Sequence, residues 1–282
     1  MFNNMEMMIT DMNLQGISQS TQESYLIRVQ SFVDFIQKDV NSIEMTDIRK
    51  YILFLKDEKK LSYGTINAYI SGIKFLFTIT LEKDWDKRTV PRMRGYKSSP
   101  AVLSKEEVFQ IINSIDNLKH KAILMTIYGS GLRVSEVAKL KVNDIDSKNF
   151  QIIVRESKNK SDRYAILSKR NLELLRTYWL TCGRPKDWLF PGMREGEHIN
   201  VKTIKNFVIK LKAKLKITKN ISAHTFRHCF ATHLLEANVQ LPHIQQLLGH
   251  KSIKSTMTYL HMTSKAMMNI NSPLDEGDGL NG

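Results

Sequence analysis

The chain has 282 residues, a length that allows one large domain or two modest ones. Hydrophobic residues make up 42% and charged residues 25%, which is ordinary for a globular protein and excludes a disordered or collagen-like chain. There are 42 Lys and Arg against 28 Asp and Glu, a formal net charge of +14. An excess of this size predicts a polyanionic partner, either nucleic acid or an anionic membrane surface.

Several features of the sequence count against the membrane alternative. No stretch approaches the roughly 20 apolar residues that span a bilayer. The first residues carry Glu6 and Asp11 and lack the basic start of a signal peptide. The two cysteines, Cys182 and Cys229, lie far apart, and a chain of this length does not need a disulfide. We therefore expect no membrane partner and a location in the reducing cytoplasm.

Residues 1–90 have the pattern of a small domain of about four helices. One helix is predicted to begin at Ser20 or Thr21, because apolar side chains follow at three- and four-residue spacing. Two similar apolar stripes begin after Asp47 and after Thr65. No grouping of catalytic side chains occurs in these residues, so they are expected to form a helical bundle that carries no chemistry.

A change in composition separates this helical domain from the rest of the chain. The segment 87–100 holds two Pro, one Gly, two Ser and five basic residues without helical periodicity, which predicts a linker over 91–100. Its basic residues could equally line a nucleic-acid backbone. We expect a second domain over 101–270 and a flexible tail over 271–282. The second domain is the better candidate for a polyanion site, because residues 1–100 hold 14 basic and 12 acidic side chains and so carry little of the excess.

The second domain is predicted to be mainly helical with one small β-sheet. Apolar periodicity predicts helices after Ser104 and over the ranges 120–128, 131–140, 171–180, 202–219, 222–236 and 241–249. Residues 150–155 and 163–167 have β-strand character and are joined by a polar turn, which predicts a hairpin. The expected fold class is therefore mainly α with a small β-sheet, divided into two domains.

One predicted helix, residues 202–219, carries seven Lys and no acidic residue around an apolar stripe. This pattern is typical of a solvated amphipathic helix. It also fits a surface that follows a nucleic-acid backbone, which the net charge favours. Both interpretations stay open at this point.

Six of the eight His lie between residues 224 and 261. His224 and His228 are four residues apart and would share one helix face, a spacing that zinc sites use. The Glu of the H-E-x-x-H pattern is missing, however, and Arg227 would place a fixed cation beside the metal. Metal binding is therefore the weaker interpretation of the His-rich block.

The stronger interpretation takes His224 and Arg227 as a unit that binds a phosphodiester. The two residues are helical neighbours, and the guanidinium fork binds two oxygens while the imidazole exchanges a proton near neutral pH. A Gly is predicted to end a helix just before His250 and to direct that imidazole out of the turn. Arg133 stands at another predicted helix start, where backbone N–H groups also favour phosphate, and Tyr259 lies within the same His-rich block.

These residues, in this order, make the chain resemble tyrosine recombinases of the phage integrase and Xer-like type over nearly its full length. Five segments carry the resemblance: residues 131–136 (GLRVSE), the hairpin turn with Lys158, residues 224–227 (HTFR), residues 248–250 (LGH) and Thr258-Tyr259. The resemblance implies a two-domain DNA clamp, in which an N-terminal helical, SAM-like core-binding domain precedes an α+β catalytic domain.

The resemblance also implies six catalytic residues around one scissile phosphate, namely Arg133, Lys158, His224, Arg227, His250 and Tyr259. The family often has Gly-Lys-Gly in the hairpin turn, whereas this sequence has Ser157-Lys158-Asn159. Lys160 follows two residues later, so either Lys could reach the phosphate. The position within the hairpin favours Lys158.

These side chains predict a reaction through a covalent intermediate. Tyr259 is expected to attack the phosphorus and form a 3′-phosphotyrosyl link while a 5′-hydroxyl leaves. His224 is expected to accept the proton of Tyr259, Lys158 to protonate the leaving oxygen, and His250 to hydrogen-bond a non-bridging oxygen. Because the covalent link conserves the phosphodiester energy, no nucleotide cofactor is expected. No metal is expected either, because no carboxylate cluster suited to two-metal hydrolysis stands out in the sequence.

The expected partners are a double-stranded DNA recombination site and further subunits, alike or different, that form a tetramer on two paired sites. The apolar residues 266–270 are a candidate for contact with a neighbouring subunit. Two other functions compete with recombination: a DNA-binding regulator that does not cleave, and a nicking-closing enzyme similar to type IB topoisomerases. Dimer resolution, transposon movement and phage integration all fit the predicted chemistry.

Overall fold

The computed structural model describes residues 2–95, 101–155 and 162–260. The chain divides into two compact units, Met1–Ser98 and Ser99–Gly282. The linker predicted over 91–100 lies only partly within the described residues, and the turn with Lys158 and the predicted tail lie outside them.

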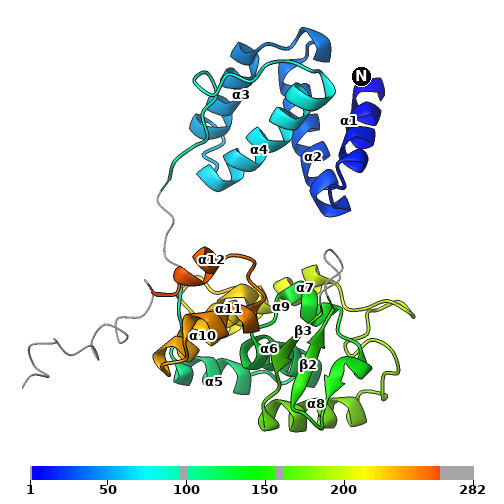
Figure 1. Cartoon of the computed structure of the whole chain (residues 1–282), viewed down its shortest axis with the longest axis vertical. Coiled ribbons are helices and arrows are strands. Elements are labelled where there is room, and N and C mark those ends of the chain that lie inside the picture. The colour runs from blue at the N-terminus through cyan, green and yellow to red at the C-terminus, as the bar shows by residue number, and fades with distance from the viewer. Residues whose placement is uncertain (1, 96–100, 156–161, 261–282) are drawn as a thin grey trace, which may run out of the picture. The chain divides into compact units, whose positions relative to one another are not determined.

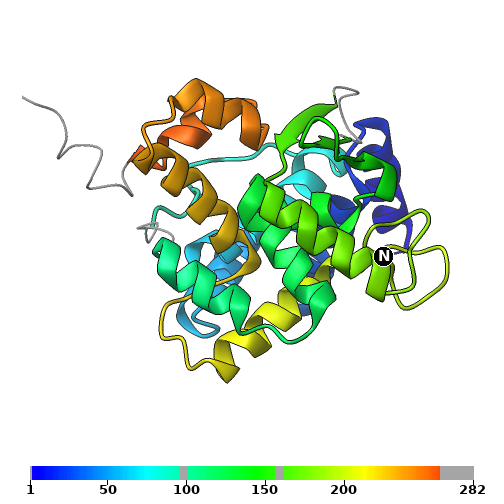
Figure 2. The ribbon, with the colours of Figure 1, turned by 90° about the horizontal axis from the view of Figure 1, so that it is seen from below.

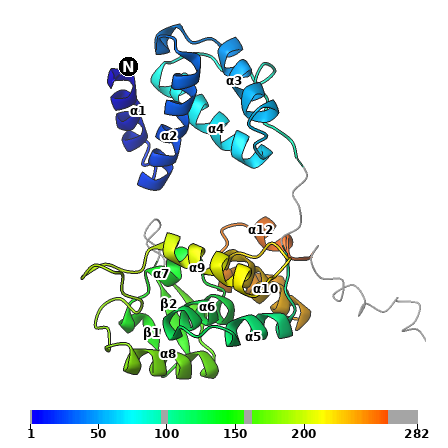
Figure 3. The ribbon, with the colours of Figure 1, turned by 180° about the vertical axis from the view of Figure 1, so that it is seen from behind.

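The first unit is a bundle of helices. In chain order its elements are α1 (Phe2–Leu14), α2 (Gln19–Ile36), a 3₁₀ turn (Val40–Ser42), α3 (Met45–Asp57), α4 (Tyr63–Phe75) and a π-helical turn (Leu76–Thr80). Figure 3 shows α4 between α2 and α3, with α1 beside α2. The predicted stripe of α2 is confirmed, because Val29, Phe32 and Val33 are buried. The apolar stripe after Thr65 is likewise part of α4, which Ser62 caps.

The second unit combines helices with a small sheet, as predicted (Figure 1). Its helices are α5 (Lys105–Asn113), α6 (Leu118–Ser130), α7 (Val134–Ala138), α8 (Lys169–Thr181), α9 (Val201–Lys214), α10 (Ala223–Glu236), α11 (Leu241–Leu248) and α12 (Ile253–Met257), with a 3₁₀ turn at Val142–Asp144. The strands β1 (Ile145–Asp146), β2 (Gln151–Val154) and β3 (Arg163–Ile166) form an antiparallel sheet in the order β1-β2-β3.

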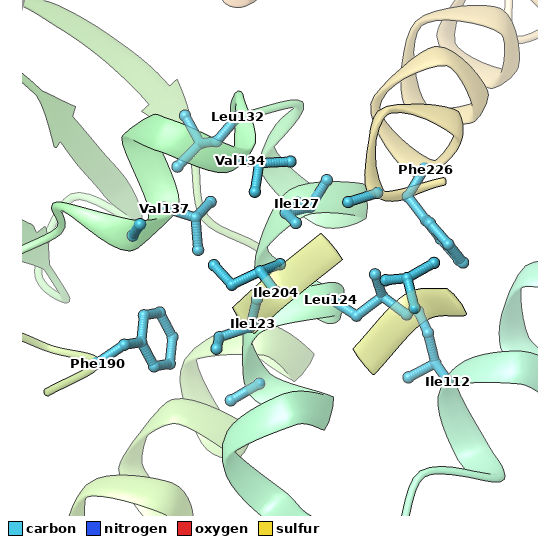
Figure 4. Packing of buried hydrophobic residues seen from close by; sticks show 14 of the residues in the cluster. Ile112, Ile123, Leu124, Ile127, Leu132, Val134, Val137, Phe190, Ile204 and Phe226 are labelled. Atoms are coloured by element: carbon cyan, nitrogen blue, oxygen red, sulfur yellow. The ribbon is translucent and has the colours of Figure 1, made fainter. Parts of the chain in front are cut away.

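Helix α6 is the centre of the second unit. Its side chains Ile123, Leu124 and Ile127 are fully buried, and Figure 4 shows them between Phe226 of α10 on one side and Val137 of α7 on the other. Figure 2 looks onto α8, which also packs against α6. Because α6 contacts α5, α7, α8, α10 and β3, its C-terminal end is fixed from several directions.

The predicted hairpin is confirmed by the pairing of β2 with β3. Ile152 faces Ala165 across the ladder, and both side chains are buried. Side chains alternate between the two faces of a strand, so this register turns Tyr164 and Ile166 outward, where they are 59% and 41% exposed. Strand β1 was not predicted, because two residues are too few for a visible alternation.

Two predicted helices are shorter than the sequence indicates. The helix expected over 131–140 is confined to α7, because Gly131 adopts a left-handed conformation that ends α6 and Arg133 is still extended. The helix expected over 202–219 ends at Lys214. Its chain turns at Lys216, which has a positive φ of 51°, and this turn brings Ile217 back against the core.

Candidate active site

Two glycines end helices at the centre of the site, and neither position accepts another residue without strain. Gly131 follows α6 with φ +64°, and a Cβ there would lie 2.4 Å from Cδ1 of Phe230. Gly249 follows α11 with φ +63°, and a Cβ there would lie 2.5 Å from Nε of Arg163. The glycines carry no side chain at these two helix ends, and the last carbonyl groups need hydrogen-bond donors from other parts of the chain.

The two arginines predicted to bind phosphate supply those donors. Arg227, on α10, donates from Nη1 to the Gly131 carbonyl at 2.6 Å and from Nη2 to the Leu248 carbonyl at 2.7 Å. Arg133 donates from Nη2 to the Gly249 carbonyl at 3.0 Å. The end of α6 is thus joined to α10, and the end of α11 to the start of α7, by cations that also suit the negative end of a helix dipole.

Glu136 is the carboxylate that neutralises these cations. Its oxygens lie 2.6 Å from Nη1 of Arg133, 2.9 Å from Nη2 of Arg163 and 3.7 Å from Nη1 of Arg227. Burial raises the pKa of Glu136, but Arg163 and the hydrogen bonds from Arg133 outweigh it, so the pKa of Glu136 is lowered overall. The site is therefore a cluster of three guanidiniums around one ionised carboxylate.

Sequence reasoning missed the roles of Glu136 and Arg163. Glu136 lies three residues after Arg133, the spacing of a helix-capping acid, and it also accepts the backbone N–H of Arg133 at 2.7 Å. Arg163 opens β3 and is 12% exposed at its side chain. The signal for Arg163 was weak, because only the hairpin brings this strand residue to the end of α11, which β3 contacts.

Burial also sets the charge state of Arg227. Its side chain is 5% exposed, and burial first, then the neighbouring Arg133, lower the pKa of Arg227 to about 10, against the opposing effect of Glu136. A group with that pKa is still protonated at neutral pH. Arg133 is the accessible member of the pair, with 34% of its side chain exposed.

His250 and Tyr259 come together beside these arginines. Nδ1 of His250 lies 2.9 Å from the hydroxyl of Thr256, and the His250 ring is nearly parallel to that of Tyr259, with 6.3 Å between the centroids. Burial first, and then the nearby Arg227, Arg133 and Arg163, lower the pKa of His250 to about 4. His250 is therefore a neutral imidazole at neutral pH.

Tyr259 is held by an apolar cluster that it forms with side chains of α10 and α11. The cluster includes Phe230, Leu235, Ile244 and Leu248, and Tyr259 is 3% exposed. Burial raises the pKa of the Tyr259 phenol above its ordinary value, and the opposing effect of Arg227 and Arg133 offsets this only in part. The phenol lies within the field of both arginines and is protonated at neutral pH.

The two remaining predicted residues are His224 and Lys158. His224 lies on α10 one turn from His228, and burial, Arg227 and then Lys205 and Arg133 lower the pKa of His224. The hydroxyl of Tyr259 makes its hydrogen bond to Nδ1 of His228, at 3.2 Å. Lys158 lies outside the described residues. The structure therefore brings together Arg133, Arg227, His250 and Tyr259, places His224 in the same field, and leaves Lys158 as a prediction.

The structure does not favour the zinc interpretation. Within the described residues, no group of three or more His, Cys, Asp or Glu is arranged to hold a metal ion. His228, one of the two proposed ligands, points Nδ1 at the Tyr259 hydroxyl instead.

Among the residues that the structure describes, none of the helices has the length and apolar character needed to span a membrane.

The lysines of α9 and of the segment after it have two different environments. Lys214 and Lys219 pair with acidic side chains of the same unit, at 2.9 Å from Asp116 and 2.8 Å from Glu107. Lys205, near the start of α9, is instead among the cations that lower the pKa of His224. Lys205 therefore adds positive charge near the site, whereas Lys214, at the end of α9, and Lys219, beyond it, are paired with carboxylates.

Both units match known protein families. Residues 101–266 match the phage integrase family, and residues 5–87 match the phage integrase N-terminal SAM-like domain. The protein y4qK of Sinorhizobium fredii is 38% identical over 269 residues, which cover 95% of this chain and 87% of that protein. Tyrosine recombinase XerA of Pyrococcus horikoshii is 32% identical over 264 residues, which cover 93% of this chain and 90% of that protein.

Solved structures agree with these matches. The chain in the crystal structure of XerA recombinase is 27% identical in sequence. The alignment covers 94% of this chain and 95% of the XerA chain, with a TM-score of 0.56. XerH site-specific recombinase bound to palindromic difH substrate, in a post-cleavage complex, covers 90% of this chain and 79% of its own with a TM-score of 0.73; at 19% identity this likeness shows the fold. The chain therefore belongs to the phage integrase family, and it is a site-specific DNA recombinase of the tyrosine type.

Proposed function

We propose that this recombinase cleaves and rejoins DNA through a 3′-phosphotyrosyl intermediate on Tyr259. The observation that carries the proposal is the convergence of Arg133, Arg227, His250 and Tyr259, from four separate segments, on the ends of α6 and α11. Binding alone does not require a phenol in the field of two guanidiniums. Transfer of a phosphoryl group to that phenol does, because negative charge builds up on the phosphate oxygens and on the attacking oxygen.

In the cleavage step, Arg133 and Arg227 bind the non-bridging oxygens of one phosphodiester. The Tyr259 oxygen forms a bond to phosphorus, and the bond from phosphorus to the 5′ oxygen of the next nucleotide breaks. An imidazole accepts the phenolic proton, a role for which the sequence suggests His224, and Lys158 gives a proton to the leaving 5′ oxygen. Neutral His250 donates a hydrogen bond to a phosphate oxygen from the ring nitrogen that Thr256 leaves available.

Strand exchange reverses the same chemistry. The 5′-hydroxyl of a second duplex attacks the phosphotyrosine, a new phosphodiester forms, and the tyrosyl oxygen leaves and takes back its proton. The number of phosphodiester bonds is unchanged, so no nucleotide hydrolysis is needed. Because two arginines supply the positive charge, we expect strand transfer to continue in the presence of EDTA, and a loss of activity on chelation would contradict this.

The test is covalent capture on a nicked suicide duplex. The recognition site is first isolated by selecting duplexes that the protein binds from a random pool. The wild-type chain is expected to form a denaturant-resistant adduct with DNA, and Tyr259→Phe to form none while still binding the site. The matched control is Tyr164→Phe, which removes a hydroxyl from a 59% exposed tyrosine and should leave the adduct unchanged.

The same assay separates recombination from its two rivals. A regulator that only binds would give no adduct with the wild-type chain. A nicking-closing enzyme would give the adduct and relax supercoiled DNA, but it would not join strands of two different duplexes. Labelling the two duplexes differently and looking for mixed products therefore decides between them.

Assembly of subunits on paired sites is the second part of the proposal. We infer that the two domains of each subunit bind DNA together as a clamp. We also infer that four subunits assemble on two paired sites. A cleft of about 820 Å³ opens between α5, α6, α8 and α10, and most of its lining is apolar, with Phe109, Met125, Leu174, Phe230 and Leu234 among the residues. We propose that the apolar side chains of Ala266, Met267, Met268 and Ile270 of a second copy occupy this cleft, because its lining is apolar.

Assembly is tested by comparing one site with two. Deletion of residues 262–282, or Leu234→Glu in the cleft, is expected to weaken the paired-site complex more than the single-site complex in a gel-shift assay. Leu180→Glu is the control, because Leu180 is 55% exposed outside the cleft. Equal weakening of both complexes would contradict the assignment of the cleft.

A further inference from the structure

The imidazole nearest to the reacting atom of Tyr259 is one that the six predicted residues do not include. Nδ1 of His228 lies 3.2 Å from the Tyr259 hydroxyl, and the two ring centroids are 5.6 Å apart. His224, one turn earlier on α10, has no such contact among the described side chains. His228 lies one turn after His224 on the same face of α10, and there its ring comes within hydrogen-bonding distance of the Tyr259 hydroxyl.

The pair is arranged for a proton to leave the phenol. The hydroxyl has one hydrogen to donate, and a neutral imidazole that accepts at Nδ1 carries its own proton on Nε2. Burial first, and then His224 and Arg227, lower the pKa of His228, so its ring is neutral and able to accept at neutral pH. The other charged or titratable groups around the pair are His250, at the end of α11, and Arg133, before α7.

We propose that His228 orients the Tyr259 hydroxyl and is the base that accepts its proton during cleavage. The inference rests on the proposed function and replaces His224 in this one role. The O–H bond of Tyr259 breaks, its proton moves to Nδ1 of His228, and the phenolate oxygen bonds to phosphorus as the 5′ oxygen leaves. In the rejoining step the tyrosyl oxygen leaves phosphorus and recovers the proton from His228, so protons balance over the full exchange. His224 is then left to contact the phosphate beside Arg227.

The burial of Tyr259 suggests the opposing interpretation, which the experiment must exclude. With 3% of Tyr259 exposed, the hydrogen bond to His228 could simply store the nucleophile away from DNA. The two interpretations of the hydrogen bond predict opposite results when His228 is replaced. Loss of the storing contact speeds cleavage, whereas loss of the base slows it.

The experiment uses a duplex whose scissile 5′ oxygen is replaced by sulfur. A thiolate leaves without being protonated, so cleavage of this duplex does not depend on the acid that serves the leaving group and reports on activation of Tyr259. Three variants are compared with the wild-type chain: His228→Ala, His228→Asn, and His243→Ala as a control on the exposed face of α11. Asn can still hold the hydroxyl by hydrogen bonding, but its amide cannot take the proton.

We expect both His228 variants to form the adduct at least about 100-fold more slowly than the wild-type chain, on the sulfur duplex as well as on the ordinary one. His243→Ala should react at the wild-type rate, and unchanged melting temperatures and DNA binding should show that the variants are folded. The proposal is overturned if His228→Asn reacts like the wild-type chain, which would leave only a holding role, or if His228→Ala reacts as fast or faster, which would make the contact a store.

Failure of the proposed function would look different. In that case the wild-type chain itself would give no adduct, or Tyr259→Phe would give as much as the wild-type chain. An adduct that depends on Tyr259 but not on His228 would leave recombination standing and remove only this inference.

Discussion

Arg133 donates a hydrogen bond from Nη2 to the backbone carbonyl of Gly249, 116 residues further along the chain, at a distance of 3.0 Å. The contact joins the start of α7 to the turn that carries His250. Arg227 makes the complementary link, because its two Nη atoms hold the carbonyls of Gly131 and Leu248. The arginines proposed to bind phosphate thus also hold the two helix ends together. A substitution that distorts either turn should therefore slow DNA cleavage.

Gly249→Ala tests this coupling. The substitution adds a methyl group 2.5 Å from Nε of Arg163 at a φ of +63°, so both the turn and Arg163 must shift. We expect a cost of roughly 1–3 kcal/mol from overpacking together with slower adduct formation. Gly183→Ala is the matched control: its φ is +82°, but no atom lies within 4 Å of the new Cβ. If the two variants cleave DNA equally fast, the turn does not position the site.

Arg227→Lys tests whether the fork of the guanidinium is needed rather than its charge. A lysine ammonium cannot donate to the carbonyls of Gly131 and Leu248 in the same planar geometry, so one helix end loses its donor. We expect adduct formation to fall by about 10²–10³-fold and the melting temperature to drop. Arg176→Lys, on the exposed face of α8, should change neither quantity. A lysine variant with wild-type cleavage would show that charge alone suffices.

The sequence was enough to predict most helices and the hairpin, because those elements have strong local signals. Helix α10 is an example: its apolar positions and its capping residue Ser222 are adjacent in the chain. The short element α12 and strand β1 have no comparable signal, since two to five residues cannot show a period. Both are defined by the tertiary contacts around them.

The site, too, contains residues that the sequence could predict and residues that it could not. Arg133, Arg227, His250 and Tyr259 were predicted because a family resemblance orders them along the chain. Glu136 lies within one of those segments and His228 directly follows another, but their roles depend on which way each side chain faces in the folded helix. Arg163 depends on the folding of a hairpin onto α11, which no local pattern encodes.

Glu136→Gln tests the carboxylate that neutralises the three arginines. The amide keeps the shape of the side chain but leaves three guanidiniums without a counter-charge in a site where Glu136 is 12% exposed. Breaking a buried pair of this kind costs about 3–5 kcal/mol, so the melting temperature should fall and cleavage should slow. Glu197→Gln removes one partner of an exposed pair, at 3.9 Å from Arg194, and should have no measurable effect.

Acid should reveal the same carboxylate in the wild-type chain. The folded pKa of Glu136 is lowered from its ordinary value of 4.5, so its contribution is present above that pH and is lost as the pH falls through the folded value. The difference in melting temperature between the wild-type chain and Glu136→Gln should therefore shrink below about pH 4.5. A difference that grows with acid would contradict the ion pairs described for Glu136.

His250 should contribute to the pH dependence of stability at a higher pH than Glu136. Its pKa is about 4 in the folded chain against an ordinary value of 6.5, so the unfolded chain takes up the proton first as the solution is acidified. The contribution of neutral His250 is complete above about pH 6.5 and declines as the pH falls towards 4. His250→Asn removes this titrating group, so the urea midpoint of the variant should fall less steeply between pH 7 and 5 than that of the wild-type chain. His243→Asn, at an exposed position on α11, should follow the wild-type slope. Equal slopes for the wild-type chain and His250→Asn would mean that burial and the three arginines do not hold His250 neutral, and its role as a hydrogen-bond donor to phosphate would then need a different charge state.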